Sequence, residues 1–422
     1  MPIHEMMSIN PEQVVPMAPP AQIIIGTQDP LPGVLGCSNK QPKIKIVIGS
    51  TFGDEGKGNV VQWLCQQALN AGKKVAVVRY SGGPQAAHTV YYNGIKHICS
   101  SYGAGVLLNI PTILSSNVLI DPISMQKERR ELISKGVQSP KIMLESRYNI
   151  NIITPFDVYF NQQDLKTLND GSCGKGINAA KQRISDEHYS YDPLENWNAA
   201  KRYYKNKHSL NIELPDELKQ TYISAHNWFN RTVQRYFDYW DFDELILEGS
   251  QGLLLDEDFG FNPHTTPSRV GLNGCLRYYT NRECEVYFVT RTYLTRHGNG
   301  YEPKHPITIP EWKEESNITN QFQGVFKTGI LEIPLLQRAF DRHNIINTCR
   351  KYNISPKLVV THTDLIDKGV INSFLLNNAG EFVMFEDTKS ALRILTKELD
   401  GYLNPENVYY CDNPNSDIKQ YV

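Results

Sequence analysis

The sequence predicts a single large α/β domain with a mostly parallel central sheet and peripheral helices. A strand-like run, KIKIVIG at 43–49, is followed by a glycine-rich loop and then by apolar residues at helical spacing from Val60 to Ala68. A second strand-like run, KVAVVRY, follows at 74–80. This order of elements is a βαβ unit, whose two strands are parallel. Later apolar runs predict further strands at 112–120, 244–249, 285–290 and 357–364.

Two segments differ from this pattern. Residues 1–42 are rich in Pro, Gln, Met and Ser and show no lasting period, which predicts a tail outside the folded domain of residues 43–422. Residues 186–242 are aromatic and charged, and apolar side chains from Trp228 to Trp240 recur at helical spacing. They predict helices packed on the edge of the sheet. Acidic residues run through the same segment, which favours a solvated helical face over an RNA-stacking surface.

The composition excludes several classes of protein. The chain has 422 residues, of which 40% are hydrophobic and 21% charged, enough for a sizeable core. Its net charge of −2 gives no reason to expect nucleic acid or an anionic membrane as partner. No apolar run approaches the about 18 residues of a membrane span, and no export signal is visible. The eight cysteines form no C-x-x-C pair, so we expect reduced thiols and a cytoplasmic protein.

The loop after the first strand, GDEGKG at 53–58, resembles a phosphate-binding P-loop. Between a strand and a helix, such a loop presents backbone N–H groups and the positive helix end to an anion, and Lys57 adds a charge for a phosphate. Thr51 stands where a P-loop has its first glycine, and Gly58 replaces the hydroxyl residue that usually binds magnesium. Asp54 is therefore a candidate magnesium ligand or general base.

A second candidate site follows the second strand, in RYSGGPQAAHTV at 79–90. Open α/β sheets bind their ligands at the carboxyl ends of strands, and His88 lies just beyond such an end. A lone histidine is more often structural than functional. The glycine pair around it and the neighbouring carboxylate loop favour a functional His88.

These two motifs resemble those of the adenylosuccinate synthetase family. GDEGKG is followed by GGPQAAHTV at 82–90, where the family usually reads GGNNAGHTV. Four later stretches are similar to family motifs in the same order: GSCGKGI at 171–177, LEGSQGLLLDEDFGFNPHTTPSR at 247–269, TRHGNG at 295–300 and VVTHTDLID at 359–367.

The resemblance implies an activity. The family joins L-aspartate to IMP with GTP and Mg²⁺ through a 6-phosphoryl intermediate, giving adenylosuccinate and GDP. By this likeness Asp54 takes the N1 proton of the purine and contacts Mg²⁺, together with the backbone carbonyl of Ala87. His88 supports transfer of the γ-phosphoryl group to the 6-oxygen. The likeness also implies a homodimer that binds small molecules.

The resemblance also assigns binding residues. Those for GTP are Gly53, Glu55, Gly56, Lys57, Gly58 and Asp364. Those for the purine nucleotide are Gln85, Ser172, Cys173, Arg183, Gln251 and Thr266.

The amino-acid pocket departs most from the family. The family has an arginine-rich loop before TGILE at 328–332, whereas this chain reads NITNQFQGVFK at 317–327 with Lys327 as its only cation. One lysine replaces a bidentate guanidinium clamp poorly. We therefore expect Arg296 and Lys327 to meet the amino acid.

Two alternatives to adenylosuccinate synthesis stay open. In one, the same chemistry acts on another 6-oxopurine nucleotide such as dGMP, or with another amine, because Pro84 and Gln85 replace two asparagines of the family. Phage relatives that act on dGMP typically lose the loop aspartate, whereas Asp54 is kept. In the other, the chain binds GTP or a purine nucleotide without ligase activity. A pure binder needs no base, so Asp54 and His88 count against it.

Overall fold

A computed structural model describes residues 41–145, 150–168, 173–186, 189–234, 239–309, 324–413 and 417–421. Residues 1–40 of the predicted tail lie outside these ranges. No helix among the described residues is long and apolar enough to cross a membrane.

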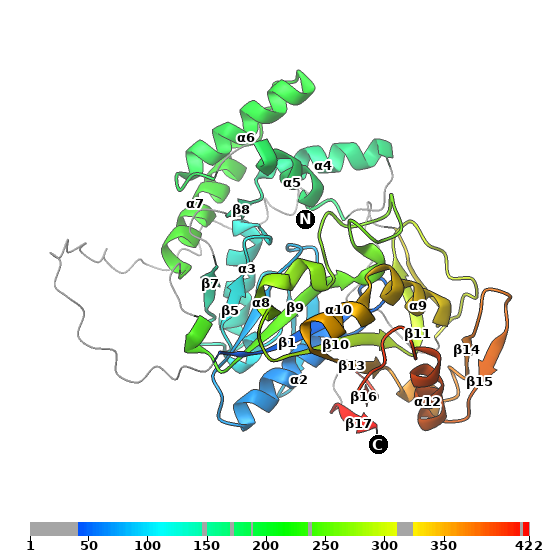
Figure 1. The fold of residues 1–422 in the computed structure, drawn as a ribbon. Helices are drawn as coiled ribbons and strands as arrows, with labels where there is room; N and C mark the ends of the chain where they lie inside the picture. Colours follow the sequence, from blue (N-terminus) through cyan, green and yellow to red (C-terminus); the bar gives the residue numbers. More distant parts are fainter. Residues whose placement is uncertain are drawn as a thin grey trace.

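A nine-stranded sheet forms the centre of the molecule (Figure 1). Every neighbouring pair in it is parallel except the pair at one edge, β16 (Asn407–Cys411) with β17 (Lys419–Tyr421), which is antiparallel. The predicted α/β fold with a mostly parallel sheet is confirmed. The strands, in spatial order, are β17 (Lys419–Tyr421), β16 (Asn407–Cys411), β13 (Ile354–Thr361), β10 (Cys284–Arg291), β1 (Lys43–Gly49), β9 (Glu244–Gly252), β2 (Val75–Arg79), β5 (Thr112–Leu114) and β7 (Ile142–Leu144).

Strand β1 lies in the middle of the sheet, between β9 and β10. Its alternate residues Ile44, Ile46 and Ile48 belong to the hydrophobic core on one face, and Val47 belongs to the core on the other. Strands covered on both faces read as nearly continuous apolar runs, which explains the sequence of this segment.

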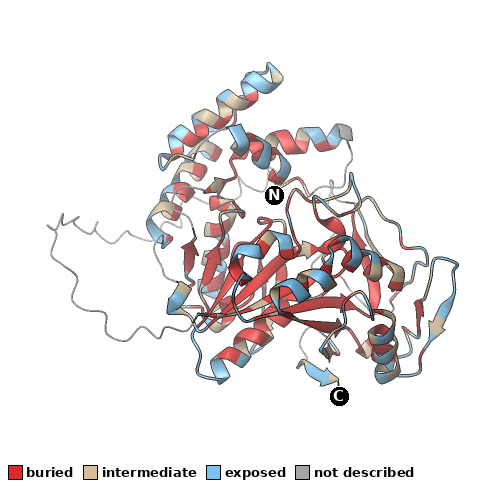
Figure 2. Cartoon of the chain, viewed as in Figure 1, coloured by how far each residue is buried: buried red, intermediate tan, exposed pale blue. Residues whose placement is uncertain are grey.

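Helices cover both faces of the sheet, and their buried sides face it (Figure 2). On the face of Val47, α2 (Lys57–Asn70) buries Val60, Leu64 and Ala68. The opposite core is completed by α9 (Ile333–Arg342), α10 (Ile345–Tyr352) and α12 (Thr388–Glu398).

A group of helices lies beyond the β7 edge (Figure 1). It consists of α3 (Pro122–Ser134), α4 (Pro155–Leu168), α5 (Ile177–Asp186), α6 (Pro193–His208) and α7 (Asp216–Thr232). The helix predicted from Trp228 to Trp240 ends at Thr232, residues 235–238 lie outside the described residues, and Tyr239–Asp241 form a 3-10 turn. Val233 is extended, and the backbone of Gln234 pairs with Ile142 and Leu144 of β7. Hydrogen bonds to an open sheet edge outweigh the helical pattern there.

Smaller elements complete the fold. The predicted strand at 112–120 is two short strands, β5 and β6 (Leu119–Ile120), and β6 pairs with β8 (Asn151–Ile152). The strand predicted at 357–364 ends at Thr361, and α11 (Asp364–Asp367) follows. Among the described residues, three antiparallel strand pairs lie outside the sheet: β3 (His88–Tyr92) with β4 (Ile95–Cys99), β11 (Tyr293–His297) with β12 (Phe326–Ile330), and β14 (Ser373–Leu375) with β15 (Phe382–Met384).

Candidate active site

The glycine loop is held between the ends of strands β9 and β13, which lie on either side of β1 and β10 in the sheet. On the β9 side, a Cβ added to Gly252 would lie 2.2 Å from Thr51 O and 2.7 Å from Gly53 N, so only glycine lets the two segments approach this closely. On the other side, the hydroxyl of Thr361 at the end of β13 donates a 2.8 Å hydrogen bond to Glu55 O. The loop is therefore fixed by residues far apart in sequence.

The loop already holds an anion, the carboxylate of Glu55. Its Oε1 accepts hydrogen bonds of 2.9 Å from Thr51 N, Thr51 Oγ1 and Gly53 N. Lys57 Nζ lies 3.3 Å from Glu55 Oε2 and donates a 2.6 Å bond to Gly53 O. Burial raises the pKa of Glu55, but Lys57 and the loop N–H groups lower it by more, so the pKa is below its usual value. These contacts show a loop arranged to stabilise negative charge.

The glycine after Lys57 brings the loop to the second candidate site. A Cβ on Gly58 would lie 2.8 Å from Thr89 O and 3.0 Å from His88 Cβ. A serine or threonine, as in a standard P-loop, would push β3 away. Gly58 thus places the first turn of α2 directly against His88.

His88 forms a buried pair with Glu248 of β9. Its Nδ1 contacts Glu248 Oε1 at short range, and Glu248 Oε2 accepts a 3.0 Å bond from Ala104 N. Burial lowers the pKa of His88, while Glu248 opposes this by raising it. His88 Nε2 is buried and makes no hydrogen bond to any described residue. Glu248 therefore fixes the ring and leaves Nε2 for a ligand.

Arg79, at the end of β2, holds the backbone around His88. Its buried guanidinium donates to Ala86 O at 2.7 Å and to Ser100 O, and Gly83 O lies 3.5 Å away. Neither Arg79 nor Glu248 was predicted as a site residue. A charged residue inside an otherwise apolar strand is the signal that could have found both, because unpaired charges are costly to bury.

Among the predicted purine-binding residues, Gln251 and Gln85 are placed for a ligand. A Cβ added to Gly53 would lie 3.4 Å from Gln251 Cα, so Gln251 lies next to the glycine loop. Gln251 Oε1 and both amide atoms of Gln85 are buried without a hydrogen-bond partner among the described residues. Buried amides usually have partners, so a bound molecule is the natural complement.

The other purine-binding predictions are less directly placed. Thr266 is buried, and its N–H donates to Leu255 O at 2.7 Å. Ser268, whose N–H bonds to Thr266 O at 2.7 Å, lines a cavity of about 230 Å³ with Tyr80, Ser81 and Lys181. Cys173 is half-buried, and Ser172 lies outside the described residues.

Arg183 is not brought to the loop. Its Nε and Nη2 each lie 2.8 Å from the carboxylate of Asp157, and Nη2 also donates to Ile152 O. Burial lowers the pKa of Arg183, but Asp157 raises it by more. Tyr204 and Thr154 donate to the same carboxylate. Arg183 thus joins α5 to α4 in this structure.

We expect Asp157→Asn to lower the free energy of unfolding by about 3–5 kcal/mol, because it leaves the Arg183 charge buried without its partner. Urea denaturation measures the change. Glu213→Gln, at the exposed ion pair with Lys201, is the matched control and should change stability little. A small loss in Asp157→Asn together with weakened nucleotide binding would make Arg183 a nucleotide ligand instead.

Asp364, which the resemblance assigns to the guanine base of GTP, follows the end of β13. It begins α11, three residues after Thr361, which contacts the glycine loop. Its Oδ2 accepts a 2.7 Å bond from Lys368, and its buried Oδ1 has no hydrogen-bond partner in the described part of the chain. His362, which lies between Thr361 and Asp364 in the sequence, has a positive φ of 62°. Its pKa is well below the usual value because it is buried and near Arg291.

Two arginines lie near Asp54, Arg291 at the end of β10 and Arg296 in β11. Arg291 donates through Nε to Asp54 O. Arg296 lies over the Phe52 ring, and burial lowers its pKa to about 10 although Asp54 and Glu302 oppose this. Arg296 is directly opposite Lys327 in the hairpin, and Lys327 pairs with Glu302. Residues 317–323 of the altered segment lie outside the described residues.

Several known proteins are similar to this chain in sequence or in fold. The sequence model of the family described as adenylosuccinate synthetase matches residues 46–315, so the match ends just before the altered segment. The adenylosuccinate synthetase of Kluyveromyces lactis is 26% identical over 76% of this chain and 79% of its own length. That of Porphyromonas gingivalis is 28% identical over 62% of this chain, with 65% of its own length covered.

Solved structures share the fold. Fully ligated adenylosuccinate synthetase from Plasmodium falciparum superposes with a TM-score of 0.68 and 17% identity, covering 90% of this chain and all of the other. Cyanophage S-2L succinoaminodeoxyadenylate synthetase, bound to dGMP and dATP as an energy donor, gives a TM-score of 0.58 and 14% identity. It covers 90% of this chain and 96% of its own.

Proposed function

The chain belongs to the adenylosuccinate synthetase family of GTP-dependent C–N ligases, and we propose that it converts IMP and L-aspartate to adenylosuccinate. The observation that carries this proposal is the meeting of an anion-holding loop with a buried His88–Glu248 pair. A protein that only binds nucleotides needs no oriented histidine beside its phosphate loop.

The proposed reaction has two steps. Asp54 accepts the N1 proton of IMP, which makes the 6-oxygen nucleophilic, and that oxygen attacks the γ-phosphorus as GDP leaves. Lys57, the loop N–H groups and His88 Nε2 stabilise the charge on the transferred group. The amino group of aspartate then attacks C6, and phosphate leaves with the 6-oxygen.

The donor set at Asp54 fits Mg²⁺. Magnesium prefers oxygen ligands, and the candidates are the Asp54 carboxylate and the carbonyl of the exposed Ala87. The neighbouring Ala86 carbonyl is already held by Arg79, which fixes the backbone next to Ala87. A bound Mg²⁺ would neutralise phosphate charge during transfer.

The guanine assignment gives a direct prediction. The wild-type protein should use GTP in preference to ATP, and Asp364→Ala should raise the KM for GTP about 10–100-fold, because a charged hydrogen bond is lost. Asp367→Ala, in the same short helix and bonded to Thr388, is the matched control and should leave the KM unchanged. Equal kcat/KM values for ATP and GTP in the wild-type protein would contradict the assignment.

A second candidate function uses the same chemistry on another nucleotide or amine. The observation that favours it is the amino-acid side of the site, where the described residues supply Arg291, Arg296 and Lys327, and Lys327 is paired with Glu302. Aspartate brings two carboxylates, which are costly to desolvate without partners. Among solved relatives, the cyanophage protein is bound to dGMP.

One experiment separates the candidates. IMP, dIMP, GMP and dGMP are each incubated with GTP, Mg²⁺ and a series of amino acids, and GDP release and product mass are recorded. We expect a succinyl adduct of IMP at tens of millimolar aspartate. Product with a different amine or base would select the second candidate, and nucleotide binding without GDP release would select a non-catalytic protein.

A further inference from the structure

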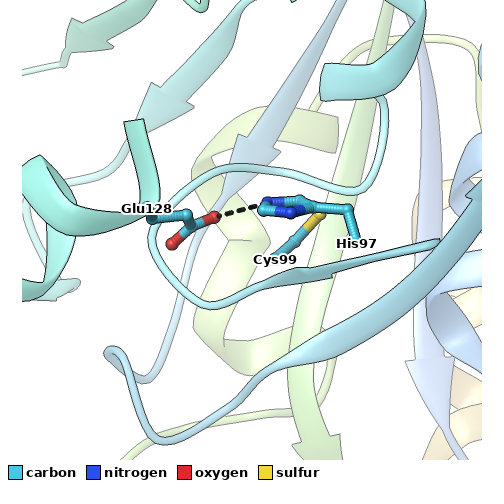
Figure 3. Close-up of side chains that lie close together, drawn as sticks. All are labelled: His97, Cys99 and Glu128. Atoms are coloured by element: carbon cyan, nitrogen blue, oxygen red, sulfur yellow. Dashed lines mark ion pairs between the residues drawn. The ribbon is translucent and has the colours of Figure 1, made fainter. Parts of the chain in front are cut away.

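A second cluster of reactive side chains, His97, Cys99 and Glu128, is shown in Figure 3. Its first two members lie on β4, the strand that pairs with the His88 strand β3. His97 and Cys99 are alternate residues of β4 and therefore share a face, and Glu128 reaches them from α3. All three are buried, and their potential ligand atoms lie within 4.8 Å of one another. The family's reaction gives none of them a role.

We propose that His97, Cys99 and Glu128 form a zinc-binding site that clips β4 to α3. The proposal does not depend on which substrates the enzyme uses. Sulfur, nitrogen and carboxylate oxygen together are the ligands that zinc takes in proteins.

The histidine is oriented as a metal ligand. His97 Nε2 faces Glu128 Oε1 at 3.5 Å and makes no hydrogen bond to any residue with a described position, although the side chain is fully buried. On the other side of the ring, Nδ1 lies 3.4 Å from Glu131 Oε1. With zinc on Nε2 the ring proton would lie on Nδ1, where Glu131 can accept it, as carboxylates usually do for metal-binding histidines. Without a metal, Lys135 Nζ donates to Nδ1 at 3.3 Å, and it also donates to Lys96 O and Glu131.

The carboxylate is also held in place. Glu128 Oε2 accepts short bonds from Ser101 N and Ser100 Oγ, at 2.6 and 2.7 Å. Oε1 has only longer bonds of 3.2 Å, from Ser100 N and Tyr102 N. Oε1 is therefore the more weakly held oxygen, and it is the one that faces His97.

The thiol completes a neutral site. Burial raises the pKa of Cys99 well above its usual value, and Glu128 and Glu248 add to this. Zinc binds the thiolate form of cysteine, so the Cys99 proton leaves when the metal binds. One thiolate and one carboxylate then balance the double charge of zinc, which a buried site requires.

The geometry needs little adjustment. Ligands at about 2.0–2.3 Å from a tetrahedral zinc lie roughly 3.3–3.8 Å apart, so side-chain shifts of about 1 Å close the cluster. Water takes the fourth position. Because Cys99 is directly opposite His88 in the hairpin, the clip also braces the strand that carries His88.

Cobalt(II) is the probe for the test. The reduced, metal-free full chain is titrated with Co²⁺, with excess Mg²⁺ present to occupy the loop site and without nucleotide. We expect a near-ultraviolet thiolate-to-cobalt band that saturates at about one equivalent per chain. Zinc should abolish this band and raise the melting midpoint by about 3–5 °C at a hundredfold excess over its Kd.

Cys99→Ser should remove the band, and Cys275→Ser is the matched control. Cys275 is equally buried but lies in the core on the opposite face of the sheet, so its variant should keep the band. No band in the wild-type chain, or a band that persists in Cys99→Ser, would overturn the proposal. If Cys99→Ser does not fold, His97→Gln and Glu128→Gln replace it. Both variants should bind cobalt at least tenfold more weakly than the wild type. An unchanged cobalt affinity in both variants would also overturn the proposal.

Discussion

Asp54→Asn should lower turnover by about 10²–10⁴-fold, because an amide cannot accept the N1 proton that makes the 6-oxygen nucleophilic. The substitution keeps the size of the side chain. The predicted GTP-binding residues Gly56, Lys57, Gly58 and Asp364 are unchanged, so GTP should still bind.

The measurement is kcat with IMP, GTP and aspartate, together with the Kd for GTP. Positional oxygen exchange in labelled GTP, followed without aspartate, shows whether the phosphoryl step itself has been lost. Asp258→Asn is the control, since Asp258 is partly exposed and paired with Arg269. A rate above about one-tenth of wild type would rule out Asp54 as the general base.

Glu248→Gln should lower kcat at least about 10²-fold and shift the pH profile. Burial lowers the pKa of His88, and nearby Lys57 and Arg79 lower it further, whereas Glu248 raises it. Replacing the Glu248 carboxylate by an amide therefore lowers the pKa of His88 further. If His88 donates through Nε2 as an imidazolium, activity is lost as the pH rises through that pKa, so the high-pH limb should move to lower pH.

The pH dependence of kcat/KM, measured for both proteins, tests this shift. Glu244→Gln is the matched control. Glu244 lies in the same strand and is also buried, but it pairs with Lys45 and Lys73 away from the loop. If Glu248→Gln loses activity but its high-pH limb is not shifted, Glu248 only supports the fold. In that case His88→Ala should retain about as much activity as Glu248→Gln.

Much of the fold could be predicted because local signals and tertiary structure agree. KIKIVIG, KVAVVRY and ELILEG are buried on both faces in the sheet, and their continuous apolar runs indicate this. The predictions that were wrong lie where backbone pairing decides. The segment after Thr232 has helical spacing, yet Gln234 forms a bridge to the open edge at Met143, and no side-chain pattern reports such a bridge.

The site was predicted in part for a similar reason. Loop residues such as Asp54 and Lys57 are recognisable because their neighbours in sequence are also their neighbours in space. Glu248 and Thr361 contact the site from other strands, so their roles appear only when the sheet is assembled. Arg183 shows the converse, since its sequence position gives no sign of its buried partner Asp157.

The central place of β1 has a consequence for biosynthesis. This strand is made first, but its two neighbours, β9 and β10, begin at Glu244 and Cys284. At the usual ribosomal speed of about 5–20 residues per second, the roughly 200 residues before β9 take about 10–40 s to synthesise. During that time the apolar β1 segment of the nascent chain has no partner strand on either edge. Such segments aggregate readily, so the yield of folded protein should respond strongly to chaperones that bind nascent chains.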